Sequence, residues 1–133
     1  MNKRNAAGQI FNNYSEIVAV YLFGSYTENP EQARDIDLAV LTRDSSLNPV
    51  NLYMELYPAL AGIFSPLEVD LLFLKNASLA MAFEIISQGK VLYSSDENAR
   101  TDYEYVISGR YMDFKYHLDI GYRELHENVK EGL

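Results

Sequence analysis

Two aspartates stand where their spacing favours metal-dependent chemistry. Asp35 and Asp37 open a stretch, Ile36 to Leu41, whose apolar composition predicts a β-strand. Side chains two residues apart in a strand point to the same face, so the two carboxylates are expected to lie side by side. Adjacent anions raise each other's pKa unless a positive charge lies between them. Mg²⁺ prefers carboxylate oxygens and keeps positions open for phosphate, so the pair predicts a magnesium site.

Asp70 is the third acid of interest, and it lies within the apolar run Val69 to Leu74. Such a run is typical of a buried strand, in which a lone carboxylate is unusual. An aspartate beside two metal-binding aspartates is suited to hold a second cation or to accept a proton from a nucleophile. Taken alone, Asp70 is equally consistent with a residue at the edge of a strand.

A tight turn is predicted at Gly24 and Ser25, directly after another apolar run, Ile17 to Phe23. That run is continuous, as expected for a strand that is covered on both faces. The Gly-Ser dipeptide alone is typical of any turn that ends a strand. Followed by Asp35 and Asp37, it predicts a loop that holds phosphate groups.

Together these residues resemble the nucleotidyltransferase superfamily of the DNA polymerase β type. In that superfamily a Gly-Ser turn comes first, a D-x-D pair follows on the next strand, and a later strand carries the third carboxylate. The chain length of 133 residues and the segments 86–93 and 111–115 narrow the resemblance. They are similar to the minimal nucleotidyltransferase (MNT) antitoxins of HEPN/MNT toxin–antitoxin modules. Arg34 departs from this family, in which serine is common at the equivalent position.

The resemblance implies an α/β (α+β) nucleotidyltransferase fold: a mixed four-stranded sheet flanked by helices, with a long C-terminal helix, in a single domain over residues 1–133. It also implies that the protein neutralises a cognate HEPN ribonuclease toxin by transferring AMP from ATP to a tyrosine of that toxin. The implied cofactor is Mg²⁺, as two ions. The implied catalytic and metal-binding residues are Asp35, Asp37 and Asp70, and the implied nucleotide-binding residues are Gly24, Ser25 and Arg34.

Two other functions are consistent with the same residues. A non-catalytic antitoxin would act only by binding and occlusion, with a vestigial site, although a vestigial site has no reason to keep three carboxylates crowded together. A small-molecule (antibiotic) nucleotidyltransferase would share the core. Such enzymes usually carry a further helical domain for the drug, whereas this chain has only one C-terminal helix.

The composition restricts the compartment and the partners. The chain is 48% hydrophobic, which indicates one packed domain, and it has no cysteine for disulfides or thiolate metal sites, as is typical of cytoplasmic proteins. No signal peptide or transmembrane run is expected, so the membrane is not a predicted partner. A net charge of −8 disfavours direct contact with nucleic acid. ATP with Mg²⁺, or a basic protein surface, fits this charge better.

Helical patterns surround the predicted strands. Pro58 is expected to kink or divide the second helix, and Gly89 is expected to end the third as a left-handed C-cap. The expected helices are Lys3 to Tyr14, Asn48-Pro49 to about Ile63, Ser78 to Gly89, and Glu97 to about Lys130, with a short strand Val91 to Tyr93 before the last helix. The residues expected to face inward are Leu52, Leu56, Leu60 and Ile63 in the second helix, and Leu79, Phe83 and Ile86 in the third.

The last helix carries two apolar stripes. The first recurs at threes and fours and is expected to cover the sheet. The second lies roughly opposite and would be exposed to water unless a partner covers it, which indicates that the toxin binds through the C-terminal helix. The first stripe is Tyr103, Ile107, Tyr111, Phe114, Leu118, Tyr122, Leu125 and Val129, and the second is Tyr105, Met112, Tyr116 and Ile120.

Overall fold

The computed structural model describes residues 2–43 and 48–131. The polar composition of Thr42 to Asn48 predicts a loop, and part of that segment lies outside the described residues. Four strands form one sheet in the order β3-β2-β1-β4. β1 is antiparallel to both β2 and β4, whereas β2 and β3 are parallel, which confirms the predicted mixed four-stranded sheet. The elements are α1 (Lys3–Phe11), β1 (Ile17–Phe23), α2 (Ser25–Glu28), β2 (Asp35–Thr42), α3 (Pro49–Phe64), β3 (Glu68–Phe73), the 3₁₀ turn η1 (Leu74–Asn76), α4 (Leu79–Gln88), β4 (Lys90–Ser94) and α5 (Glu97–Glu131).

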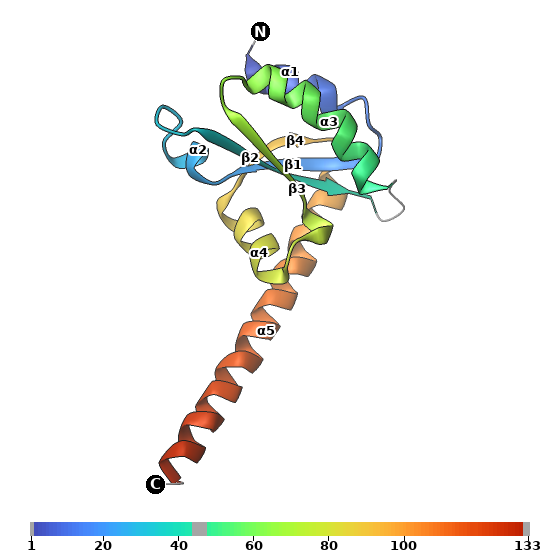
Figure 1. The fold of residues 1–133 in the computed structure, drawn as a ribbon. Coiled ribbons are helices and arrows are strands. Elements are labelled where there is room, and N and C mark those ends of the chain that lie inside the picture. The colour runs from blue at the N-terminus through green and yellow to red at the C-terminus, as the bar shows by residue number, and fades with distance from the viewer. Residues whose placement is uncertain (1, 44–47, 132–133) are drawn as a thin grey trace.

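Helices cover both faces of the sheet. Figure 1 shows α1 and α3 on one side, and α4 with the beginning of α5 on the other. Because strand side chains alternate, Leu38 and Val40 of β2 pack under α1 and α3, while Ala39 and Leu41 pack under α4 and α5. Burial on both faces explains why the predicted strands are continuously apolar.

α3 runs without interruption through Pro58, so this proline does not divide the helix, and the alternative expectation of a kink stays a prediction. A proline removes one backbone donor, but the buried stripe continues on both sides of it and holds the two halves on the same sheet face. The buried residues of α3 are Leu52, Leu56, Leu60 and Phe64, whereas the predicted Ile63 is only half-buried.

The end of α4 also differs from the prediction. Gly89 has φ −75° and ψ 171°, an extended conformation, and is not a left-handed cap. A Cβ at this position would lie 2.5 Å from the carbonyl oxygen of Ile85 and 3.0 Å from that of Leu22. Close backbone packing of α4 against β1, and not backbone handedness, is therefore the reason for glycine here.

The inward face of α4 centres on Ala82 and Ile85, which are its buried residues. The predicted residues flank these two and are partly buried against the same cluster: Leu79, Phe83 and Ile86. At the other end of the chain, α1 stops at Phe11 instead of continuing to Tyr14.

α5 contacts the rest of the protein only over its first turns and then projects away from it (Figure 1). Of the first predicted stripe, Ile107 is buried, and Tyr111 is half-buried and stacks on Phe83 at a centroid distance of 4.1 Å. Farther along, the side chain of Phe114 is 53% exposed and that of Tyr122 is 73% exposed. Contrary to the prediction, the first stripe therefore covers the sheet only as far as Tyr111.

Hydrogen bonds fix the base of α5 to the sheet. The Tyr21 hydroxyl of β1 donates to the Glu104 carboxylate at 2.7 Å, and the Arg100 guanidinium donates to the same carboxylate at 2.9 Å. Burial raises the pKa of Tyr21 well above its ordinary value, so the phenol keeps its proton and remains a donor. Within the described residues, no helix combines the length and the apolar content that crossing a bilayer requires.

Candidate active site

The parallel pairing of β2 and β3 brings the three predicted aspartates to one edge of the sheet. Asp37 is directly opposite Asp70, and Asp35 is opposite Glu68. Their neighbours along the strands, such as Ile36, belong to the core under α1 and α3. The acids therefore point to the other face, toward α4, as the alternation of strand side chains requires. The predicted neighbourhood of Asp35, Asp37 and Asp70 is present in the fold.

Asp37 lies at the centre of this acidic group. Its pKa is raised, first by partial burial, then by the charges of Asp70 and Asp35, and finally by a hydrogen bond with Asp70. A hydrogen bond between two carboxyl groups requires that one of them carries a proton. Asp35 and Asp70 are exposed, whereas Asp37 is half-buried. The site is thus an anionic centre that gains free energy by binding a proton or a cation.

Gly24 lies against this centre. Its φ of 81° belongs to the backbone region that favours glycine. A Cβ built at Gly24 would lie 2.0 Å from Oδ2 of Asp37, far inside any permitted contact. The predicted tight turn is in fact the start of the one-turn helix α2, with Gly24 at its N-cap position and Ser25 exposed beside it. Glycine is required here by conformation and by space.

Two further residues of the site were not predicted. The Thr27 hydroxyl donates to the Gly24 carbonyl at 2.7 Å, and the Thr27 amide donates to the same oxygen at 3.1 Å, so Thr27 holds the turn. Glu68 shares the face of the aspartates. The signal for Glu68 was its spacing from Asp70, which repeats the spacing of Asp35 and Asp37. The signal for Thr27 was a hydroxyl residue three positions after a turn glycine.

Arg34 lies immediately before β2 and is exposed. Its carbonyl accepts a hydrogen bond from the Glu68 amide at 3.0 Å, which aligns the first residues of β2 and β3. Its guanidinium forms no ion pair with any described residue. This backbone role is structural, and the assignment of Arg34 to nucleotide binding stays a prediction.

A hollow of about 400 Å³ opens beside Gly24, between the end of β1, α2 and α4. Its lining includes both apolar and polar residues: Phe23, Gly24, Thr27, Glu28, Met81, Glu84, Ile85, Gln88 and Lys90. A larger pocket exists at the other end of the same sheet face. Asp35, Asp37 and Asp70 line neither cavity, but Gly24, which lies against Asp37, lines the smaller hollow. We therefore assign the active site to the acids and the smaller hollow beside them.

No three His, Cys, Asp or Glu side chains among residues 2–43 and 48–131 converge closely enough to form a finished metal cage. The donor set nevertheless fits a hard divalent cation, because it consists of neighbouring carboxylates with only oxygen ligands. The pKa of Asp37 is raised first by partial burial and then by the negative charges of Asp70 and Asp35, which a cation would offset. Asp35, Asp37 and Asp70 are therefore the residues that could hold a divalent cation.

Comparisons with known proteins agree with this geometry. Residues 5–98 match the family model described as polymerase beta, nucleotidyltransferase. The chain is 30% identical over 99 residues to the protein adenylyltransferase MntA of Shewanella oneidensis, a match that covers 74% of this chain and 69% of that protein.

Solved structures give the same picture. A toxin–antitoxin structure with AMP-PNP is 25% identical, with a TM-score of 0.64, and the match covers 97% of this chain and 98% of the other. A second match is to a chain in a structure described as the tri-AMPylated Shewanella oneidensis HEPN toxin in complex with MNT antitoxin. The identity is 25% and the TM-score is 0.59, and the match covers 96% of this chain and 98% of the other. An MntA–HepT complex, 24% identical with a TM-score of 0.61 over 96% of each chain, shares the fold.

Proposed function

Because this chain belongs to the polymerase beta nucleotidyltransferase family, we propose that it is an antitoxin that transfers AMP from ATP to a tyrosine of a cognate HEPN ribonuclease toxin. The relative MntA is named a protein adenylyltransferase, and a similar structure contains a tri-AMPylated HEPN toxin. The observation that carries the proposal is the contact of Gly24 with Asp37, beside Asp35 and Asp70. A cytoplasmic location is part of the proposal, because ATP is abundant there.

The Gly24 turn and the adjacent hollow would bind ATP. A glycine leaves its backbone open to close approach by phosphate oxygens, and Ser25 adds an exposed hydroxyl and an amide at the same place. The hollow offers apolar surface from Phe23, Met81 and Ile85, which suits the adenine ring. Gly24 belongs to both features, so the triphosphate would lie between the hollow and the aspartates.

The aspartates would bind Mg²⁺. Asp35 and Asp37 are the proposed ligands of both ions, with Asp70 completing the site on the side of the attacking group. When bound, divalent cations neutralise phosphate charge and stabilise the attacking and leaving oxygens of an in-line displacement. The negative charge that raises the pKa of Asp37 supplies the attraction.

Asp70 is the proposed general base. A tyrosine hydroxyl has an ordinary pKa of about 10 and is a weak nucleophile until it loses its proton. Asp70 is exposed and adjoins Asp37, so its carboxylate could take that proton from an acceptor above the sheet edge. The acceptor oxygen then bonds to the α-phosphorus as the bond to pyrophosphate breaks.

α5 is the proposed contact with the toxin. Beyond Tyr111 large apolar side chains of both stripes are exposed, including Tyr116 at 63% and Leu118 at 57%. Exposed aromatic side chains that are buried on binding commonly supply much of the affinity of an interface. The exposed helix would favour binding even if the antitoxin acted by occlusion alone, so binding and transfer must be measured separately.

The test is AMP incorporation into a candidate HEPN toxin. The toxin is incubated with the antitoxin, ATP and Mg²⁺, and its mass is measured with peptide mapping of the modified residue. We expect an added AMP on a tyrosine with the unmodified antitoxin, and none with Asp37→Asn or with EDTA. A toxin that is inhibited to the same extent without any added AMP would favour occlusion and refute the catalytic proposal.

A further inference from the structure

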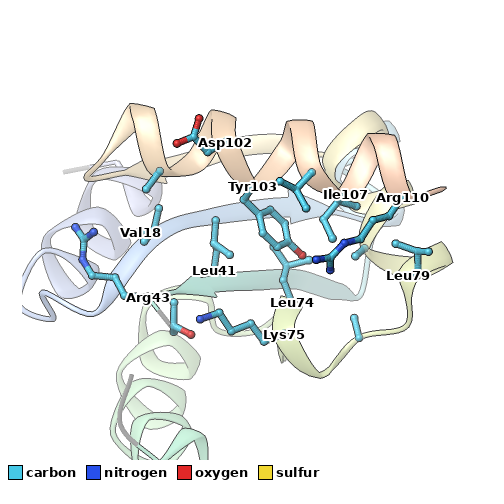
Figure 2. Close-up of a pocket in the computed structure, with 15 residues that line it drawn as sticks. Val18, Leu41, Arg43, Leu74, Lys75, Leu79, Asp102, Tyr103, Ile107 and Arg110 are labelled. Carbon is cyan, nitrogen blue, oxygen red and sulfur yellow. The ribbon is translucent and has the colours of Figure 1, made fainter. Parts of the chain in front are cut away.

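A second, larger pocket lies on the same face of the sheet as the acids, at the opposite end of β2 (Figure 2). Its volume is about 750 Å³, which is within the range of small-molecule sites. Thr42 of β2 lines it, whereas Asp37 belongs to the active site. These two residues are about 16 Å apart along an extended strand. A small ligand in this pocket is therefore too far from the acids to react there.

The interior of this pocket is largely apolar. The ends of β1 and β2 with η1 form one wall, and α5 forms the other (Figure 2). Tyr103 extends from α5 into the middle of the pocket (Figure 2). Burial raises the pKa of Tyr103, so its hydroxyl keeps its proton and can donate to a ligand. The main apolar lining residues are Val18, Leu41, Leu74, Leu79, Ala82 and Ile107.

Positive charge gathers at this pocket, although the chain as a whole is acidic. Arg43, Lys75 and Arg110 line it against one carboxylate, Asp102, whereas the chain has 11 Lys and Arg against 19 Asp and Glu. Figure 2 shows Asp102 directed away from the pocket and Arg110 directed into it. Arg110 has no ion-pair partner in the described part of the chain, and Arg43 remains 44% exposed although it pairs with Asp96. The pocket therefore suits an anionic ligand.

We propose that this pocket binds a nucleoside 5′-monophosphate, separately from the ATP of the active site. The apolar walls and the ring of Tyr103 would contact the base, which is planar and has polar edges. Arg110 would hold the phosphate, because a guanidinium group binds phosphate oxygens through paired hydrogen bonds. A phosphate without a base would leave the apolar walls uncovered, and a base without a phosphate would leave Arg110 without an ion-pair partner.

Ligand binding at this place would join two parts of the fold. Leu41 lines the pocket from β2, whereas Tyr103 and Arg110 line it from the part of α5 that packs on the sheet. A molecule held by both would link α5 to the sheet, and binding to the folded state alone raises the melting temperature. The proposal thus gives two independent readouts, affinity and thermal stability.

The test uses AMP as the probe and the full chain carrying Asp37→Asn, in buffer with EDTA. These conditions remove the cation and one carboxylate from the proposed ATP site, so failure of that site does not affect the result. We expect one AMP per chain and a higher melting temperature. Arg110→Ala should weaken AMP binding by about tenfold or more, as for loss of a charged hydrogen bond. Arg123→Ala, on the exposed part of the same helix, is the matched control and should leave the affinity unchanged.

Several results would contradict this site. AMP binding that requires Mg²⁺ or an intact Asp37 would belong to the active site. An equal loss of affinity in Arg110→Ala and Arg123→Ala would indicate a general charge effect. Inorganic phosphate and adenosine serve as separate probes, and each should bind more weakly than AMP. Equal affinity for phosphate and AMP would show that the base is not bound. Arg110→Lys keeps the positive charge but lacks the guanidinium group, so an unchanged affinity for AMP in this variant would argue against paired guanidinium hydrogen bonds.

Discussion

At the scale of residues, the account depends most on Asp37. A carboxyl group whose pKa is raised on folding destabilises the folded state once it ionises. The stability of the protein without cations should therefore fall as the pH rises from the ordinary pKa of aspartate through the raised value, and then level off. Asp37→Asn lacks this loss, so it should be more stable than the unmodified protein at neutral pH. The difference should shrink as the pH falls through that range.

This prediction is checked by urea denaturation of both proteins at several pH values in EDTA. Asp113→Asn, an exposed acid on the projecting part of α5, is the control and should show no comparable pH-dependent gain. If Asp37→Asn is less stable at neutral pH, Asp37 must be stabilised by interactions other than those described, and the anionic centre would be wrong.

Gly24 gives a second test at this scale. In Gly24→Ala the new Cβ would meet the Asp37 carboxylate, and a non-glycine residue at φ 81° adds strain of about 1–3 kcal/mol. We expect lower stability to denaturant and loss of AMP transfer. Gly62→Ala is the matched control, because nothing lies within 4 Å of its Cβ and α3 tolerates alanine. That variant should gain up to about 1 kcal/mol and keep full activity.

The residues of the site were predictable to different degrees. The D-x-D spacing and the isolated acid in an apolar run placed Asp35, Asp37 and Asp70 on one face, and the parallel register of β2 and β3 brings Asp37 and Asp70 together as expected. The register itself could not be derived from the sequence. Glu68 was overlooked for that reason, since its importance depends on facing Asp35 across the sheet.

At the scale of elements, the base of α5 should depend on its bond to β1. Tyr21→Phe keeps the ring but removes the hydroxyl that donates to Glu104, which should cost about 1 kcal/mol of unfolding free energy. Hydrogen exchange should increase first in the amides of the initial turns of α5. Tyr105→Phe, whose side chain is 82% exposed on the same helix, should change neither measurement. Unchanged exchange in Tyr21→Phe would mean that apolar packing alone holds the helix.

The projecting part of α5 should act in binding and not in stability. Tyr116→Ala removes a side chain that is 63% exposed, so the melting temperature and ATP binding should be preserved while the affinity for the toxin falls. Ile107→Ala is the opposite control: this residue is buried, and its truncation should cost about 2–5 kcal/mol of stability. Calorimetric titration with the toxin measures the first effect. A Tyr116→Ala protein that binds the toxin normally would remove this stripe from the interface.

The sequence predicted the existence of the elements better than their ends and faces. Apolar periodicity located the strands and all the long helices, and the side chains of Asn48 and Ser78 cap α3 and α4 as expected. Periodicity could not show that α5 leaves the sheet after Tyr111, because an exposed stripe and a buried stripe have the same spacing. The role of Gly89 was also missed, since its close approach to the Leu22 carbonyl of β1 is a tertiary contact.

At the scale of the whole molecule, the two ends of one sheet face have opposite character. The first residues of β2 and β3 present carboxylates, and the end of β2 with α5 presents arginines around an apolar pocket. A net charge of −8 conceals this separation. The acidic end suits cation-bound ATP, and the basic end suits an anion without a cation. The part of α5 beyond Tyr111 is about 30 Å long, and it is the proposed contact with a protein partner.

The most direct test of the central claim is the ribonuclease activity of the toxin after it has been separated from the antitoxin. The toxin is incubated with antitoxin, ATP and Mg²⁺, and it is then separated from the antitoxin under conditions that dissociate the complex. The purified toxin is assayed for RNA cleavage and for covalently attached AMP. The account predicts that toxin treated with the unmodified antitoxin stays inactive and carries AMP, whereas toxin treated with Asp37→Asn recovers full activity and carries none. Recovery of full activity after treatment with the unmodified antitoxin, or inactivation without AMP, would contradict it.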